Sequence, residues 1–383
     1  MKILEVLCGG KWGGGGVVVR SFVKELIERG DEVWVMALDD EVAERFAEVG
    51  ARIIRSPFWF RPINPLDIIP FVQIWALCLR HRFDLVATHT SKGGFIGRVA
   101  ARLAGIPYII HHAHGFAFRE AQRPWIQRLY MVLERIAAGA CDCILSVSEE
   151  HRQAAIEEGV APAGKIRTIL NGIDLAPFEN ATRESARRKL GFGDAEMLIG
   201  AANRLVPGKG VQHLVAAAPV ILAAYPAAHI VLFGDGPMEA GLREEAANSG
   251  FGDRIHFKGF RQDVPELLAA FDVLVQPSLS EGLSISVLES MAAGKALVVC
   301  DIRGNRELIE HRRNGWMVPM AQPSVLADAV CTLLGNPALA EQLGREAQRD
   351  CRARFTQNRM IEQTLAAYDG RAVTLPGLQE STL

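Results

Sequence analysis

The sequence has 383 residues, of which 49% are hydrophobic and 22% charged, with a formal net charge of −2. This composition excludes a largely disordered chain, and the length favours two domains that each bury a core. Seven cysteines at irregular spacing argue against a secreted disulfide framework. No signal-peptide pattern is evident, and the most apolar run, 68–79, is too short to span a bilayer, so we expect a cytoplasmic protein.

The amino-terminal end predicts a strand, a glycine-rich loop and a helix. Lys2–Leu7 is a short apolar strand pattern, Gly9, Gly10 and Gly13–Gly16 follow it, and a helix is predicted at Val17–Glu28. Glycines between a strand and a helix allow close backbone approach to a phosphate or sugar, and a flexible structural turn is the alternative. The spacing is not G-x-G-x-x-G, which disfavours a dinucleotide-binding dehydrogenase.

An excess of positive charge lies between residues 52 and 135. There, twelve Lys and Arg face four acids, a net charge of +8, with Trp59, Trp75 and Trp125 among the interleaved aromatic residues. Aromatic side chains beside cations suit a membrane–water interface, where each basic group near anionic lipid contributes about 1 kcal/mol. Nucleic-acid binding would show similar charge, but no recognised motif accompanies it. We expect an anionic membrane surface as a partner, with a solvated basic face as the alternative.

Three histidines lie at or just after the end of a predicted buried strand, Tyr108–His112. They are His111, His112 and His114, and they cluster at its carboxyl end, where open α/β sheets place ligands. Zinc binding is one interpretation. However, residues 111 and 112 should point to opposite faces of a strand, and no Cys or carboxylate lies nearby in the sequence. We therefore expect no metal, and a core-satisfied histidine is the remaining alternative to a ligand contact.

Two motifs follow apolar strand patterns in the second half. In Asn203–Gly210, NRLVPGKG, Arg204 and Lys209 flank a Pro-Gly turn. An Arg fork and a Lys point charge on two sides of a turn can hold a diphosphate. The second motif is Gly234–Pro237, GDGP.

A third motif, within Ser278–Ala296, places Glu281 before a glycine turn and Glu289 eight residues later. The segment is predicted to run from a loop into a helix, so Gly282 and Leu283 offer backbone N–H groups where the helix dipole favours an anion. Glu281 then faces the reacting group, and Glu289 accepts hydrogen bonds from a diol such as ribose. Two solvated glutamates are the alternative for the pair alone, and the order of all three motifs disfavours it.

Together these motifs resemble the donor half of the retaining GT-B glycosyltransferases, the group 1 or family 4 enzymes with an E-x7-E motif. The resemblance implies an α/β fold with two Rossmann-like parallel-sheet domains that face a cleft. We expect an acceptor-binding domain at 1–170, a linker at 171–194 and a nucleotide-sugar-binding domain at 195–355. A helix at 356–370 should cross back to the first domain, and a tail should follow at 371–383.

The resemblance also implies roles for individual residues. Arg204 and Lys209 would bind the diphosphate, Glu281 would lie by the donor sugar, Glu289 would hold the ribose, and His114 would contact the sugar. The implied catalytic set is His114, Glu281, Arg204 and Lys209. The implied donor-binding set is Gly15, Gly16, Arg204, Lys209, Phe260, Glu281, Gly282, Leu283 and Glu289.

The segment HAHGFAF is similar to a bacterial branch that builds O-antigen, lipopolysaccharide and capsule on polyprenyl diphosphate. This implies transfer of an N-acetylhexosamine or hexose from a nucleotide-diphosphate sugar, with uridine as the expected base, to a polyprenyl-diphosphate-linked saccharide. The enzyme would be peripheral on the inner face of the cytoplasmic membrane. No cofactor or metal is expected, since no D-x-D motif follows a strand. A nucleotide-sugar 2-epimerase and a non-catalytic nucleotide-sugar or saccharide-binding protein are alternatives, and the E-x7-E pair with Arg204 and Lys209 favours transfer.

Overall fold

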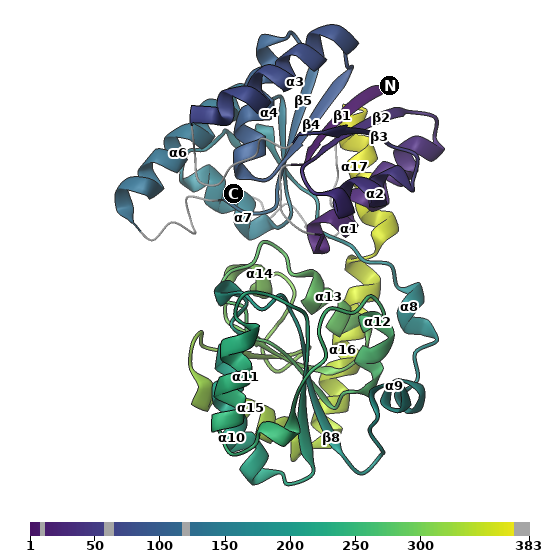
Figure 1. Cartoon of the computed structure of the whole chain (residues 1–383), viewed down its shortest axis with the longest axis vertical. Coiled ribbons are helices and arrows are strands. Elements are labelled where there is room, and N and C mark those ends of the chain that lie inside the picture. Colours follow the sequence, from purple (N-terminus) through teal and green to yellow (C-terminus); the bar gives the residue numbers. More distant parts are fainter. Residues whose placement is uncertain (8–11, 57–64, 117–122, 371–383) are drawn as a thin grey trace, which may run out of the picture. The chain divides into compact units, whose positions relative to one another are not determined.

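The computed structural model describes residues 1–7, 12–56, 65–116 and 123–370, which form two compact units (Figure 1). One unit comprises Met1–Asn171 and Asn358–Leu383, and the other Gly172–Gln357. Each described unit has a parallel sheet flanked by helices, which is the architecture that alternating strand and helix patterns predict. The predicted α/β class with two parallel-sheet domains is therefore confirmed.

The amino-terminal unit is built on seven described strands in the order β3-β2-β1-β4-β5-β6-β7, all paired in parallel. The strands are β1 (Lys2–Leu7), β2 (Glu32–Ala37), β3 (Arg52–Arg55), β4 (Leu85–His89), β5 (Tyr108–Ala113), β6 (Cys143–Ser146) and β7 (Ile166–Thr168). The helices are α1 (Gly14–Glu28), α2 (Asp40–Ala47), α3 (Ile68–His81), α4 (Ser91–Leu103), α6 (Pro124–Gly139), α7 (Glu149–Glu157) and α17 (Gln357–Tyr368). The strand order reverses between β1 and β4, and open sheets bind ligands outside the carboxyl ends of such a strand pair.

Gly14, Gly15 and Gly16 lie in a helix and not in the loop that we predicted, whereas Gly9 and Gly10 of the same prediction lie outside the described residues. α1 begins at Gly14, so Gly15 and Gly16 lie in its first turn, and the first backbone bond of the helix joins Val17 N–H to Gly13 O at 3.1 Å. The strong apolar stripe of this helix, which includes the buried Phe22, favours helix formation upstream of Val17. The two glycines therefore present helix-terminal amides, which favour anions, rather than a flexible turn.

The carboxy-terminal unit has six described strands in the order β10-β9-β8-β11-β12-β13, also parallel. The strands are β8 (Met197–Ala202), β9 (Ala228–Phe233), β10 (Ile255–Phe257), β11 (Val273–Gln276), β12 (Ala296–Cys300) and β13 (Trp316–Val318). The helices are α8 (Ala176–Glu179), α9 (Arg183–Leu190), α10 (Val211–Ala224), α11 (Glu239–Asn248), α12 (Val264–Leu267), α13 (Ile285–Ala292), α14 (Arg303–Arg306), α15 (Pro323–Leu334) and α16 (Pro337–Arg354). Here the order reverses between β8 and β11.

Residues 171–194 are not the linker that their polar composition predicted. They contain α8 and α9, and all of them except Asn171 belong to the carboxy-terminal unit. Arg187 of α9 is fully buried, and its guanidinium donates to Ala270 O at 3.0 Å, to Glu196 O at 2.8 Å and to Asp272 Oδ2 at 2.9 Å. A single buried arginine thus fixes an otherwise charged helix to the unit.

The chain enters and leaves the carboxy-terminal unit at neighbouring points. Ile173 N–H donates to Phe355 O at 3.0 Å, and Gln357 N–H donates to Ile173 O at 3.0 Å. A Cβ at Gly172 would lie 2.2 Å from Thr356 O, so this close approach requires glycine. The helix predicted at 356–370 is α17, and it packs within the amino-terminal unit through Tyr368.

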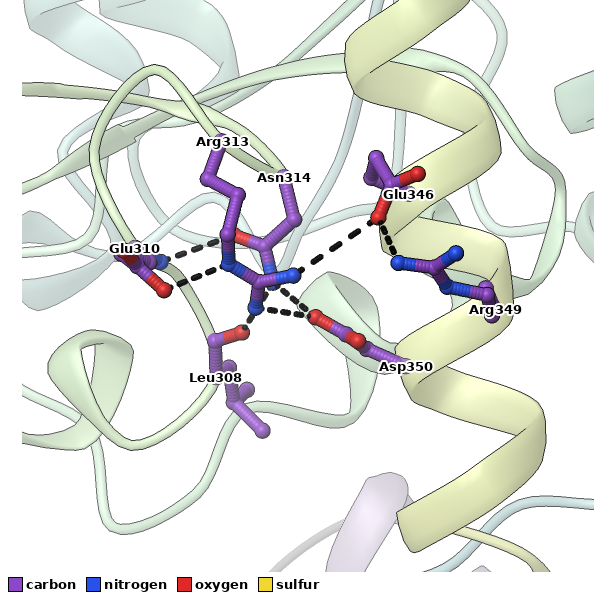
Figure 2. A network of polar contacts seen from close by, with 7 residues as sticks. All are labelled: Leu308, Glu310, Arg313, Asn314, Glu346, Arg349 and Asp350. Carbon is purple, nitrogen blue, oxygen red and sulfur yellow. Dashed lines mark hydrogen bonds and ion pairs between the residues drawn. The ribbon is translucent and has the colours of Figure 1, made fainter.

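A polar network fastens α16 to the loop that precedes β13 (Figure 2). Asn314 is buried, and its Nδ2 donates to Leu308 O at 3.0 Å and to Asp350 Oδ2 at 2.7 Å. Arg313 pairs with both Asp350 and Glu310. Burial alone would raise the pKa of Asp350, but hydrogen bonds from Arg313 and Asn314 hold it below its ordinary value. Loop and helix therefore share one ionised carboxylate.

The apolar run at 68–79 makes up all of α3 except its last two residues. Its residues divide between a buried face, with Ile74 and Cys78, and an exposed face, with Val72 and Leu79. Across the described ranges, no helix has the length and apolar character needed to cross a membrane.

Candidate functional site

The three motifs of the second half meet at the carboxyl ends of β8 and β11, where the strand order reverses. Leu279 N–H donates to Gly208 O at 2.9 Å, which joins the first and third motifs. Leu205 N–H donates to Asp235 O at 2.7 Å, which joins the first and second. A Cβ at Gly210, where φ is 68°, would lie 1.9 Å from Pro277 O, so the loops can pack this closely only with glycine there.

Lys209 and Glu281 form an ion pair in this cluster. Lys209 Nζ donates to Glu281 Oε1 at 2.6 Å, and the side chains are 28% and 11% exposed. Arg204, by contrast, is exposed, and its side chain forms no hydrogen bond or ion pair with another described residue. The structure thus brings Lys209 and Glu281 together, while Arg204 projects freely from the same loop.

Glu289 lies on α13 and is half-buried. Burial raises the pKa of this carboxyl to about 7, and within the described part of the chain no hydrogen bond offsets that cost. The helix is capped by Ser284, whose Oγ accepts from Val287 N–H at 3.4 Å. Gly282 and Leu283 directly precede this cap, and the Leu283 side chain is buried, so Leu283 can offer a ligand only its backbone.

Phe260 follows β10, the strand that pairs with β9, and is 54% exposed. Gly234 N–H of the second motif donates to Gly259 O at 2.8 Å, so the Phe260 loop adjoins the GDGP turn. An exposed aromatic ring at this edge can stack on a planar ligand group.

The sequence interpretation missed a buried polar group beneath the cluster. Asn203 Nδ2 donates to Gln276 Oε1 at 2.6 Å, and Gln276 Nε2 reaches Ser290 Oγ at 3.4 Å. Asn203 Oδ1 and Ser278 Oγ are buried without a hydrogen-bond partner among the described residues. Buried polar atoms are rarely left unsatisfied in native proteins, so a bound ligand or water is the natural partner. The sequence signal that could have found these residues is a polar side chain at the end of an apolar strand pattern, as at Asn203 and Gln276.

In the amino-terminal unit, the histidines lie at the carboxyl ends of β4 and β5. His114 is half-buried, and its Nε2 lies 3.2 Å from His89 Nδ1. His89 Nε2 lies 2.8 Å from Glu5 Oε2, and Tyr368 OH donates to Glu5 Oε1 at 2.8 Å. Burial, with a contribution from the nearby His89, lowers the pKa of His114 to about 3, so this ring is neutral at physiological pH.

His111 and His112 point to opposite sides of β5, as predicted. His111 Nδ1 lies 3.0 Å from Thr88 Oγ1, and its ring fills the space that a side chain at position 94 would need. His112 instead stacks on Phe22 of α1. Burial lowers the pKa of both rings well below the ordinary value. No cluster of metal-ligating side chains is found among the described residues.

Glu5, His89 and Tyr368 were not predicted as site residues. A carboxylate in the middle of the apolar strand Lys2–Leu7 was the only hint available for Glu5. Tyr368 is 363 residues from Glu5 in the sequence, and no local pattern connects them.

The family is decided by two matches that together cover most of the chain. The model of "Glycosyltransferase Family 4" matches residues 12–177, and that of "Glycosyl transferases group 1" matches residues 182–350. An Escherichia coli UDP-Gal:alpha-D-GlcNAc-diphosphoundecaprenol alpha-1,3-galactosyltransferase is 31% identical over 259 residues, which is 66% of this chain and 67% of that enzyme. The chain belongs to the group 1 glycosyltransferases. The predicted family and the predicted glycosyltransferase class are confirmed.

Other relatives of this glycosyltransferase align over nearly its whole length. A Campylobacter jejuni N,N'-diacetylbacillosaminyl-diphospho-undecaprenol alpha-1,3-N-acetylgalactosaminyltransferase is 27% identical over 91% of the chain and 93% of that enzyme. Anabaena Alr3699/HepE, solved in complex with UDP and glucose, aligns with a TM-score of 0.82 at 23% identity, covering 97% of this chain and 100% of that one. WaaG, a glycosyltransferase involved in lipopolysaccharide biosynthesis, aligns with a TM-score of 0.77 at 16% identity, covering 96% and 100%. These structures confirm the GT-B fold.

Proposed function

We propose that this glycosyltransferase moves a hexose or N-acetylhexosamine, with retention of anomeric configuration, from a UDP-sugar to a polyprenyl-diphosphate-linked saccharide. The observation that carries the proposal is the half-buried Lys209–Glu281 pair, at 2.6 Å, at the carboxyl ends of β8 and β11. A cation and a carboxylate side by side suit a substrate with a diphosphate next to a sugar. The names of the Escherichia coli and Campylobacter jejuni relatives, both of which act on diphospho-undecaprenol saccharides, support the acceptor class.

The donor is assigned to the carboxy-terminal unit. Lys209 and the exposed Arg204 bind the diphosphate, and the unsatisfied Asn203 Oδ1 and Ser278 Oγ are available to donor hydroxyls. Glu289 accepts from the ribose, and Phe260 stacks on the base. Gly282 and Leu283 supply backbone contacts at the start of α13. For the amino-terminal unit, Gly15, Gly16 and His114 stay predictions as donor-contacting residues.

Catalysis in this proposal rests on charge. Arg204 and Lys209 stabilise the charge that develops on the leaving diphosphate, since preorganised cations act most strongly where charge forms in the transition state. Glu281 stabilises positive charge at the anomeric carbon. The leaving phosphate oxygen accepts the acceptor's proton on the same face of the sugar, which retains the configuration.

The proposed function is tested by incubating the protein with UDP-sugars alone and then with a polyprenyl-diphosphate saccharide. We expect a lengthened lipid-linked saccharide in the second reaction only. A changed sugar without acceptor would favour a 2-epimerase, and binding without either reaction would favour a non-catalytic binding protein.

The first prediction is metal independence. The side chains of Arg204 and Lys209 supply cationic charge, and no further cofactor is proposed. The adjacent Asp39 and Asp40 do not form a D-x-D motif, and Asp39 caps α2 by accepting from Glu41 N–H at 3.0 Å. Transfer should therefore continue in excess EDTA at the untreated rate. Loss of activity in EDTA that Mg²⁺ or Mn²⁺ restores would contradict the cation-based mechanism.

The second prediction concerns the proton on Glu289. Ribose hydroxyls donate to the ionised carboxylate, so donor binding should lower its pKa from about 7. Near pH 7 and below, binding should release a fraction of a proton, and donor affinity should rise as the pH is raised through 7. Titration calorimetry of a UDP-sugar in buffers of different ionisation enthalpy measures this release. In Glu289→Gln the release should vanish and affinity should fall by roughly 1.5–3 kcal/mol. Equal proton release in both proteins would refute the assignment.

The acceptor side of the proposal includes a membrane surface on α3 and α6. Apolar residues at helical spacing are exposed on both helices, and each helix contacts α4. On α3 and α6 these exposed residues are Ile68, Val72, Trp75, Leu79, Trp125, Leu129, Val132 and Ile136. Arg80, Arg128 and Arg135 are exposed beside them. Trp59 lies outside the described residues. The combination of apolar stripes and flanking arginines matches an anionic lipid surface.

The third prediction is binding to vesicles that contain anionic lipid. Binding should weaken as salt rises, because the arginine contribution is screened. Trp125→Ser with Leu129→Ser should reduce binding several-fold, whereas Val220→Ser, an exposed apolar residue of the other unit, should not. Equal vesicle binding by both variants, or binding that ignores lipid charge, would count against the surface.

A further inference from the structure

A buried chain of hydrogen-bonding groups runs from β1 to His114. Glu5 is completely buried in an otherwise apolar strand, and its two carboxylate oxygens contact His89 Nε2 and Tyr368 OH, each at 2.8 Å. The second ring nitrogen of His89 lies 3.2 Å from His114 Nε2. The carboxylate is therefore linked to His114 through one intervening imidazole.

The packing around His89 fixes its ring plane. The ring stacks on His112 with centroids 4.5 Å apart and planes 19° apart, and His112 in turn stacks on Phe22. His112 Nε2 lies 2.9 Å from Tyr368 OH, so the tyrosine that donates to Glu5 accepts from this ring. The residue after His89, Thr90, has φ 61° and ψ 162°, a region that residues other than glycine rarely adopt. The end of β4 is thus held in one arrangement despite local strain.

The proton positions follow from what each group can donate. An ionised carboxylate only accepts, so the proton of His89 must lie on Nε2, towards Glu5. In neutral His89, Nδ1 then carries a lone pair and can only accept from His114. His114 must therefore carry its own proton on Nε2, which leaves its Nδ1 as an acceptor.

We propose that Glu5 and His89 are positioning residues that hold His114 in the Nε2–H tautomer, so that its Nδ1 accepts a hydrogen bond from a substrate hydroxyl. That substrate contact rests on the proposed function; the tautomer does not. Because tertiary partners commonly select the tautomer of a functional histidine, loss of the carboxylate should act on His114 through His89.

The direct test is nitrogen NMR of the intact protein with 15N-labelled histidine, using His114→Asn to assign the His114 signals. At neutral pH the wild type should show protonated Nε2 and unprotonated Nδ1. In Glu5→Gln the amide can donate as well as accept, so the His114 signals should move towards the Nδ1–H tautomer. Thr88→Val removes a buried contact on the opposite face of β5 and should leave the His114 signals unchanged. A wild-type His114 with its proton on Nδ1, or an unchanged tautomer in Glu5→Gln, would overturn the proposal.

His89→Asn covers the case in which Glu5→Gln does not fold. Asparagine keeps a polar atom near the position of Nδ1 but breaks the link to Glu5, so the same loss of the fixed tautomer is expected. For folded variants, kcat should fall at least tenfold while the KM for donor changes by less than threefold. A changed tautomer with unchanged kcat would support the positioning of His114 by Glu5 and His89 and refute the substrate contact of His114. An unchanged tautomer would refute this positioning, whatever the rate.

Discussion

Replacing Lys209 by alanine should lower kcat/KM by about 10²–10³-fold, the loss typical of removing one preorganised group that stabilises transition-state charge. The ammonium group faces charge that grows as the diphosphate leaves, so kcat should fall together with donor affinity. Its loss also leaves Glu281, which is 11% exposed, without its cation and beside a diphosphate. The effect should therefore exceed that of a simple lost contact. Arg204→Ala should lower kcat/KM in the same direction.

Steady-state kinetics measure this effect, and the chain offers a matched control. Lys189 pairs with Glu266 at 2.6 Å in the same unit, but both side chains are about half exposed. Lys189→Ala should leave turnover unchanged. In the double variant Lys209→Ala/Glu281→Gln, the loss should be less than the sum of the two single effects, because the repulsion is removed. Folded Lys209→Ala protein with wild-type turnover would eliminate the donor-site assignment.

Arg187→Leu should destabilise the carboxy-terminal unit by about 3–5 kcal/mol, the range found when one partner of a buried ion pair is removed. The leucine leaves Ala270 O and Glu196 O without their donor, and among the described residues Asp272 keeps only Arg183 as an ionic partner. Arg188 is the next residue on α9, is exposed and pairs with Glu184. Arg188→Leu should change stability by less than about 0.5 kcal/mol.

Native-state hydrogen exchange in β8 and β11 reports this difference locally, which suits a chain with two units. Faster exchange in both strands is expected for Arg187→Leu and not for Arg188→Leu. Equal protection in the two variants would show that α9 is not anchored through Arg187.

The fold was predictable where local patterns and topology agree. Apolar runs such as Lys2–Leu7 and Met197–Ala202 formed strands at the predicted bounds, because buried parallel strands are apolar on both faces. The segment 171–194 was misread because one tertiary contact set, that of Arg187, overrides a composition typical of a linker. α1 began early because its apolar stripe outweighed the poor helix propensity of Gly14–Gly16.

Candidate site residues were predictable where they lie close together in the sequence or on neighbouring strands. Glu281 and Glu289 share one short segment, and the pairing of Lys209 with Glu281 follows from the adjacency of β8 and β11. The chain from Glu5 to His114 joins β1, β4, β5 and α17, so its members become neighbours only through the complete topology. No spacing rule applies to such a set.

The paired backbone bonds at Ile173 have a consequence for how the chain is organised. Since Ile173 N–H meets Phe355 O at 3.0 Å, residues 172–357 begin and end at one place, as an inserted domain does. We therefore expect an excised 172–357 segment, whose ends are adjacent, to fold by itself and to tolerate grafting. The host is less separable, because cutting before α17 would remove Tyr368 and with it the hydroxyl that holds Glu5. We therefore expect genetic dissection to be one-sided: the insert should be separable whole, whereas a cut before α17 should disrupt the host.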